Sequence, residues 1–436
     1  MSQTQSNLIR NKWQAIFTEK VREAEQIAQS SQRERAMSVE QLVQTLVLGC
    51  LEQETVSLRS WCEVAADLGC QITTSSLDER LTQRAVMLLH LVLQASVEYQ
   101  VAVQTLPVEA LQCFSRMVLY DSTVITLPPQ LRCIFQGTSP EQGALKAQLA
   151  YDYLNGQLSA LSIQEGRQPD QKDAGLLAQA VAGALLIFDL GYFNQQTLAQ
   201  IAERQAYFVT PYQSQTALYD PATHASLDLV QALQQTEGDY FEINCLLGGK
   251  TQLRLRLIAR RVSAEQAEKQ RRGRKRQARQ GGYTPSARSL LLCEWEIIVT
   301  NLPVTWRAQQ VLDLYRVRWQ IELIFKGWKS YLRLARFGDW RPERVLCQLY
   351  AGLIGAVLCQ TCFAVVRYQQ LEASFFKSLL VIRRHVTQLL VVIRHHWWGM
   401  ARWSQDLAQA LLRFARQPTL KAVPSTLQRL INWSLT

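Results

Sequence analysis

Cysteine, glycine and proline are scarce in this 436-residue sequence, and only 19% of its residues are charged. Ten cysteines scattered from Cys50 to Cys362 are too dispersed for a small disulfide-stapled scaffold. With 20 glycines, 12 prolines and 48% hydrophobic residues, the composition excludes a collagen-like or disordered chain. The first residues are polar and unlike a secretory leader, which together with the cysteine usage favours a reducing cytoplasm. At about 150 residues per domain, we expect two to four domains.

Long uncharged runs are rare as well. One segment, Val345 to Val366, has 22 residues without a charge and is long enough to cross a bilayer. It contains the polar residues Gln348 and Gln360 and stands alone, and a buried helix of a helical domain has the same pattern. We therefore expect a core helix and no membrane association.

Charge of one sign is concentrated in a single stretch. The formal net charge is +11, and Arg260 to Arg279 holds nine Lys/Arg and two Glu. Such a run is either a solvated surface or a contact for a polyanion such as DNA. Because Gly281-Gly282 and Pro285 follow it, we expect a mobile loop or a frayed helix. The candidate phosphate contacts in it are Arg271, Arg272, Arg274, Lys275 and Arg276.

Hydrophobic periodicity divides the chain into three regions. Residues 1–105 have a helical period, which predicts a helical N-terminal domain. A role of this domain in DNA binding is expected from charge and helicity alone. Residues 106–340 mix period-two strands with helices, include a hairpin signal at Asn155-Gly156, and contain a strand-rich insertion at about 207–300. Residues 341–436 are again helical. The expected fold class is α+β or α/β, with helical regions flanking the mixed domain.

The chemistry-bearing pattern lies in the sequence LYRVRWQIELIFKGWKS. Steps of three, four and seven residues put four polar side chains within about 60° of one helix face. These are Tyr315, Arg318, Glu322 and Lys329. Val317, Ile321, Ile324 and Trp328 fall on the opposite, core-facing side. The alternative is a pair of ordinary surface salt bridges, Arg318 with Glu322 and Glu322 with Lys326.

Two aspartates end predicted strands, and strand ends meet at one edge of a sheet. Asp121 follows Met117 to Tyr120, and Asp189 follows the apolar run that ends at Phe188. Together with Glu322 they would form three mutually repelling carboxylates unless divalent cations lay between them. A strand-terminal aspartate can instead cap the next turn.

The residues from about Met117 to Tyr331 resemble the bacterial insertion-sequence DDE transposases with the Tyr-Arg-Glu-Lys (YREK) signature. Tyr315 to Lys329 fits the spacing Tyr-x2-Arg-x3-Glu-x6-Lys, and the sequences around Asp121 and Asp189 are similar too. Leu190 departs from the arginine often found there. The resemblance implies a ribonuclease H-like core in which Asp121, Asp189 and Glu322 are the catalytic residues and bind two Mg²⁺ or Mn²⁺ ions.

The same resemblance implies the partners and the reaction. The protein would cleave double-stranded DNA at element ends and transfer strands to target DNA, as a homodimer near the nucleoid. Tyr315, Arg318, Lys326 and Lys329 would contact DNA, and Trp295 would stack on a base turned out of the helix, unless it is simply a core residue. The alternatives are a nuclease of the same fold without strand transfer and a non-catalytic DNA-binding descendant.

Two further motifs have ordinary explanations. Cys359-x2-Cys362 has metal-ligand spacing but lacks a second pair, so buried thiols are expected. The stretch from Arg394 to Trp403 alternates cations and aromatic rings, which either pack in a core or stack on unpaired bases.

Overall fold

Six α-helices precede the first strand in the part of the chain that the computed structural model describes. That part comprises residues 3–29, 37–53, 55–367, 373–416 and 426–433. The helices are α1 (Gln3–Phe17), α2 (Glu19–Ala28), α3 (Val39–Glu52), α4 (Leu58–Asp67), α5 (Thr74–Asp78) and α6 (Gln83–Glu98). Ser38 and Ser57 begin α3 and α4 with capping boxes, which satisfy amide groups that a helix leaves unpaired. The prediction of a helical N-terminal region is confirmed.

Two compact units, each assembled from separated segments, make up the fold. The first unit consists of Met1–Pro107, Ser122–Gln168 and Trp319–Pro424. The second unit consists of Val108–Asp121, Pro169–Arg318 and Ser425–Thr436. The chain thus leaves the second unit after Asp121 and again after Arg318. The expected domain boundaries at 105/106 and 340/341 follow sequence order and stay a prediction.

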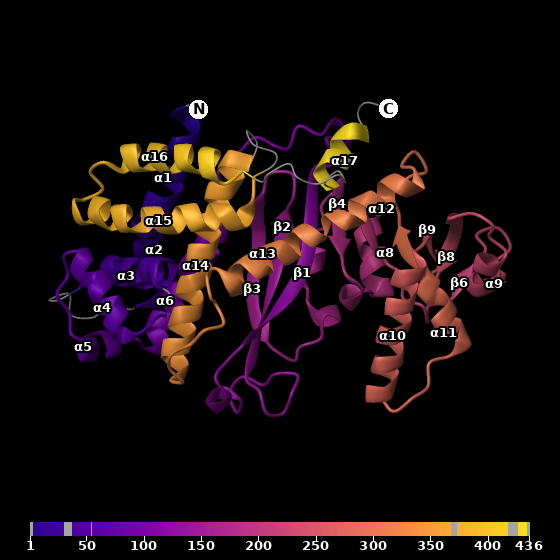
Figure 1. Ribbon diagram of the computed structural model, residues 1–436, viewed down its shortest axis with the longest axis horizontal. Coiled ribbons are helices and arrows are strands. Elements are labelled where there is room, and N and C mark those ends of the chain that lie inside the picture. The colour runs from indigo at the N-terminus through magenta and orange to yellow at the C-terminus, as the bar shows by residue number, and fades with distance from the viewer. Residues whose placement is uncertain (1–2, 30–36, 54, 368–372, 417–425, 434–436) are drawn as a thin grey trace. The chain divides into compact units, whose positions relative to one another are not determined.

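Helix α14 (Pro342–Arg367) is the central helix of the first unit and contacts α1, α3 and α6 (Figure 1). It is the one described helix that is long and apolar enough to cross a membrane, yet 94% of its most apolar window is buried. Small residues of α14 allow close packing of this helix against α3, since a Cβ on Gly355 would lie 2.9 Å from Leu51 Cδ2. The expectation of a core helix is confirmed.

The remaining elements of the first unit are a hairpin and three further helices. The strands are β2 (Ala144–Asp152) and β3 (Gln157–Glu165), after the short η2 (Pro129–Leu131). They pair antiparallel around the predicted Asn155-Gly156 turn, where Gly156 has φ +74°. The helices are α13 (Trp319–Ser330), α15 (Phe375–Arg394) and α16 (Met400–Phe414).

A mixed sheet forms the frame of the second unit. Its strand order is β1-β4-β5-β10-β9-β8-β6-β7, in which β1, β4 and β5 are parallel and the later pairs are antiparallel. The bounds are β1 (Arg116–Thr126), β4 (Ala184–Phe188), β5 (Tyr207–Pro211), β6 (Leu218–Tyr219), β7 (Ser226–Leu227), β8 (Tyr240–Leu247), β9 (Leu253–Arg261) and β10 (Trp295–Thr300). The predicted strand-rich segment after residue 207 is therefore present.

The other elements of the second unit are helices that precede, connect or follow these strands. They are η1 (Glu109–Leu111), η3 (Asp170–Lys172), α7 (Gly175–Ala178), η4 (Leu190–Tyr192), α8 (Gln195–Glu203), α9 (Leu229–Gln234), α10 (Ala264–Gln280), α11 (Ala287–Leu291), η5 (Leu292–Glu294), α12 (Ala308–Val317) and α17 (Thr426–Asn432). The basic run predicted as a loop or a frayed helix is a regular helix of 17 residues, α10. The helix begins after Ser263, whose side chain accepts a hydrogen bond from the Gln266 amide. The prediction from charge did not take this N-cap into account.

Candidate active site

Parallel pairing of β1 with β4 brings two aspartates to adjacent positions in the second unit. Tyr120 of β1 lies opposite Phe188 of β4 in the register. Asp121 directly follows Tyr120, and Asp189 directly follows Phe188. Asp189 follows the end of β4, as predicted. Asp121 lies within β1 rather than at its end, because Ser122 and the residues after it continue the strand instead of turning.

Side chains from the end of α12 contact both aspartates. Arg318 Nη1 lies 2.9 Å from Asp121 Oδ2, and each side chain of this ion pair is only 16% exposed. The Tyr315 hydroxyl donates to Asp189 Oδ1 at 3.3 Å. Burial raises the pKa of Tyr315, so the phenol remains a donor at neutral pH. Two residues of the predicted motif therefore hold the two predicted carboxylates.

The sequence analysis missed a supporting pair beside Asp121. Tyr120 is 2% exposed, and its hydroxyl donates to Asp173. Burial raises the pKa of Tyr120, with a further contribution from the hydrogen bond to Asp173. The chain must pass close to this phenol, since a Cβ on Gly175 would lie 2.2 Å from its oxygen. The spacing of 53 residues between Tyr120 and Asp173 gives no sequence signal.

The prediction of one helix for this motif is wrong, because α12 ends at Val317 and α13 begins at Trp319. Glu322, Lys326 and Lys329 belong to α13, in the first unit. Glu322 lies in the first turn of the helix and Lys329 in the last. Desolvation lowers the pKa of Lys329, although the side chain remains on the surface. Lys326 Nζ lies 5.8 Å from the centre of the Phe376 ring. The predicted core side of this motif is confirmed, because Val317, Ile321, Ile324 and Trp328 are buried.

Carboxylate oxygens are the donors that Mg²⁺ and Mn²⁺ prefer, so the chemistry of the predicted ligands fits these ions. Within the described residues, no group of three or more His, Cys, Asp or Glu side chains is close enough to hold a metal ion. Asp121 and Asp189 belong to the second unit and Glu322 to the first.

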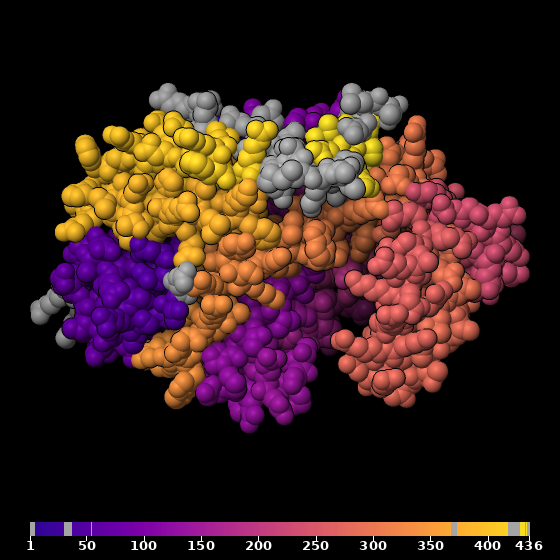
Figure 2. Space-filling model, in the orientation of Figure 1, coloured from indigo at the N-terminus to yellow at the C-terminus, as the bar shows by residue number. Residues whose placement is uncertain are grey.

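Helix α10 carries most of the basic run and lies at the surface of the second unit (Figure 2). Ala267 and Ala278 are buried and mark its packed side. Arg271 turns toward that side and forms an ion pair with Glu294. Arg274 is half-buried, whereas three of the predicted phosphate contacts, Arg272, Lys275 and Arg276, are exposed. The contact of these residues with DNA stays a prediction.

Trp295 begins β10 and is 4% exposed. The guanidinium of Arg261, on the paired strand β9, lies 4.5 Å from the centre of the indole ring. A base could stack on that face only after Arg261 moved away. Burial therefore favours packing for Trp295, and base stacking stays a prediction.

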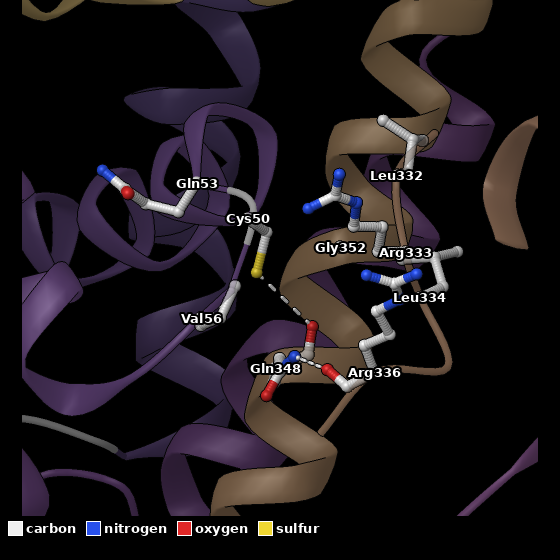
Figure 3. Close-up of a pocket in the computed structure, with 9 residues that line it drawn as sticks. All are labelled: Cys50, Gln53, Val56, Leu332, Arg333, Leu334, Arg336, Gln348 and Gly352. Carbon is white, nitrogen blue, oxygen red and sulfur yellow. Dashed lines mark hydrogen bonds between the residues drawn. The ribbon is translucent and has the colours of Figure 1, made fainter. Parts of the chain in front are cut away.

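Two other features lie outside the predicted site. Cys359 and Cys362 are fully buried, and Trp13 Nε1 donates to Cys362 Sγ at 3.3 Å, which agrees with the expected buried thiols. A small pocket in the first unit lies where the end of α3, the segment after α13 and α14 meet (Figure 3). Hydrogen bonds join its walls, from Cys50 Sγ to Gln348 O and from Gln348 Nε2 to Arg336 O. None of the predicted site residues lines it.

Comparisons with known proteins give consistent results. A family model described as "Transposase DDE domain" matches residues 112–358. The transposase for insertion sequence element IS231F of Bacillus thuringiensis subsp. israelensis is 27% identical over 75% of this chain and 74% of its own length. The transposase for element IS1151 of Clostridium perfringens is 26% identical over 57% of each chain. A cryo-EM structure of the piggyBac transposase synaptic complex with hairpin DNA has 10% identity and a TM-score of 0.46, covering 95% of this chain and 85% of that one.

Proposed function

The chain belongs to the DDE transposase family and is a DNA transposase that cleaves and joins DNA with metal ions, and on that premise we propose that Asp121, Asp189 and Glu322 are its catalytic carboxylates. The observation that carries the proposal is the β1–β4 register, because Asp121 and Asp189 directly follow its last pair, Tyr120 and Phe188. Arg318 and Tyr315 of the motif that contains Glu322 bind these two aspartates. Glu322 is four residues after Arg318.

The proposed catalytic core is ribonuclease H-like. It would comprise the hairpin β2–β3, strand β1, and the parallel strands β4 and β5, with β6 to β10 as the insertion before the glutamate. Support comes from the parallel order β1-β4-β5, since parallel strands direct their carboxyl ends to one edge. Asp121 lies on β1 and Asp189 directly follows the neighbouring parallel strand β4, where that fold would need them.

The proposed ligands would bind two Mg²⁺ or Mn²⁺ ions. Bound there, the ions would lower the pKa of an attacking water and stabilise charge on the departing 3′ oxygen. The residues of this chain have distinct tasks around them. Asp121 and Asp189 supply oxygen ligands, and Arg318 and Tyr315 keep these two side chains in place. The Arg318 guanidinium, which has five N–H donors, would contact a DNA phosphate in addition to Asp121.

The other contacts with DNA are proposed from charge and position. Lys326 and Lys329 follow Glu322 on α13 and would bind phosphates close to the cut. Helix α10 would bind duplex DNA further from the reacting bond, through charge alone. We further propose that the four residues of the YREK signature, Tyr315, Arg318, Glu322 and Lys329, act here as they do in the transposases that carry it. The protein would act on element ends as a homodimer and would be associated with the nucleoid.

The test uses the purified full chain, duplex DNA that carries the element ends, and Mg²⁺. We expect nicking by the wild type, and strand transfer when pre-cut ends are supplied with target DNA. Asp121→Asn, Asp189→Asn and Glu322→Gln should each abolish both steps while DNA binding stays within about tenfold, because a neutral amide is a poor ligand for these ions. The matched control is Glu237→Gln, which changes an exposed acid of the second unit.

Each result decides a separate point. Normal cutting by any of the three variants removes that residue from the site. Nicking without strand transfer from pre-cut ends identifies a nuclease, and DNA binding without nicking by the wild type identifies a non-catalytic DNA-binding protein.

A further inference from the structure

The turn between α15 and α16 has an unusual backbone. His396 and Trp397 have φ angles of 53° and 65°, and Gly399 has φ +87°. Two consecutive non-glycine residues in the left-handed region are uncommon, because their Cβ atoms crowd the backbone. Backbone hydrogen bonds hold the turn in this form, from the Trp397 amide to Val392 O at 2.9 Å and from the Met400 amide to Trp397 O at 3.1 Å.

Two tryptophans anchor this turn to the first unit. The Trp397 ring stacks on Phe17 with centroids 6.4 Å apart and an interplanar angle of 30°. Trp403 is 3% exposed, and its Nε1 donates to His385 O at 2.9 Å. The turn is therefore fixed on both sides, and α15 and α16 lie side by side along their length (Figure 1).

The tryptophan between these anchors points into solvent. Trp398 is 83% exposed, the most exposed of the large hydrophobic residues among those described. Burying its ring against the unit would have gained hydrophobic free energy, yet the turn directs it outward. A strained backbone that displays an apolar ring indicates a binding role rather than a packing role.

Basic residues lie close to Trp398 in the sequence. Arg394, His395 and His396 are exposed, and the Arg402 side chain is 88% exposed. Asp406 is the one acidic residue in the sequence from Phe375 to Phe414, a stretch with six Lys/Arg. It lies 3.9 Å from Arg402, a distance at which an exposed ion pair is weak. The pair of helices that carries Trp398 is thus predominantly basic, which suits a polyanion.

We propose that Trp398 stacks on an unpaired base of bound DNA while the basic residues Arg394 and Arg402 contact the adjacent phosphates. Paired bases inside a duplex already have both faces stacked, so a free indole face selects a base that has lost its neighbours. Stacking tolerates any base because every base has a π face. The inference rests on the proposed function only in that the partner is DNA, whose cleavage and joining leave unpaired bases at the strand ends.

The experiment measures binding of the full chain to a fluorescein-labelled dT12 oligonucleotide and to a duplex of similar length, by fluorescence anisotropy. Trp398→Ala should weaken binding of dT12 by about 5- to 150-fold and leave binding of the duplex within about twofold. Trp398→Phe, which keeps an aromatic face, should restore most of the affinity for dT12. The matched control is Trp340→Ala, since Trp340 is 62% exposed and belongs to the same unit.

Four results would overturn the proposal. They are an unchanged affinity of Trp398→Ala for dT12, an equal loss for dT12 and duplex, loss of binding to anionic phosphatidylserine vesicles with dT12 binding unchanged, and a Trp398-dependent change of oligomeric state without any effect on dT12. The last two would assign the ring to a membrane surface or to a second copy of the chain. Every variant in the test of the three carboxylates retains Trp398, so failure here leaves that test unaffected.

Discussion

Helix α10 offers the sharpest test of how the protein binds duplex DNA. At about 100° per residue, Arg272, Lys275, Arg276 and Arg279 fall within about 100° of one another around the helix axis. All four are exposed. Arg271 lies outside this arc and is neutralised by Glu294, at the packed side of the helix. A rigid helix presents one side to a duplex, so the four residues of the arc should carry the binding.

The expected magnitude follows from counterion release. Each phosphate neutralised adds about 0.9 to the slope of log affinity against log salt concentration. Replacing all four residues of the arc with glutamine should therefore reduce the slope by about 3.6. Between 50 and 200 mM salt, the wild-type affinity should then fall about 150-fold more than that of the variant. Glutamine keeps a good helix propensity, so α10 should remain folded.

The assay is titration of an unrelated duplex at several salt concentrations, followed by anisotropy. The control variant is Arg271→Gln with Arg274→Gln, which removes two charges outside the arc and should change the slope by less than about 1. Equal slopes for the wild type and the fourfold variant would show that the arc is only solvated. Equal effects of the two variants would mean that charge acts without regard to the side of the helix.

Three further predictions concern stability. Trp295→Ala should lower the melting temperature by several degrees and depress both reaction steps, because a ring that is 4% exposed leaves a cavity; a slowed second step at unchanged stability would instead assign it to base stacking. Burial lowers the pKa of Lys12 to about 8, below its ordinary 10.5, so the unfolded state binds this proton more tightly than the folded state does. The free energy of unfolding should therefore rise by about 3 kcal/mol as pH rises from about 8 through 10.5. Lys12→Met should remove that rise in urea titrations, and an identical pH profile would contradict the reasoning. A Cβ on Gly49 would lie 2.5 Å from Trp61 Cδ1, so Gly49→Ala should destabilise the protein by about 1–3 kcal/mol. Gly273 has open space around it, so Gly273→Ala should stabilise the protein by up to about 1 kcal/mol. The midpoints of urea unfolding test both expectations.

Local patterns predicted the elements that depend on neighbours in sequence. The Asn155-Gly156 signal and the alternation on either side correctly placed the β2–β3 hairpin. The apolar run that ends at Phe188 correctly placed Asp189 at the end of β4. The buried side of α13 followed from its 3.6-residue period, because that period depends only on which residues avoid water.

Features that depend on tertiary contacts could not be read from the sequence. The polar pair Ser122-Thr123 resembles a turn, but β1 continues through it, so Asp121 lies within a strand. The charge run of α10 hid a helix whose buried residues are only Ala267 and Ala278. The Arg318–Asp121 ion pair joins residues 197 positions apart, and the spacing of the motif favoured Glu322 as the partner of Arg318. The roles of these residues in catalysis stay predictions.

The interleaving of the two units has a consequence for synthesis on the ribosome. Helices α3 and α6 pack on α14, which begins about 240 residues after α6 ends. At about 5–20 residues per second, the apolar sides of the early helices wait roughly 12 to 50 s for that partner to be translated. During this interval the nascent chain exposes surfaces that chaperones bind. Slow elongation or truncation before residue 367 should therefore direct the polypeptide toward aggregation or proteolysis, which limits how much active protein a cell accumulates.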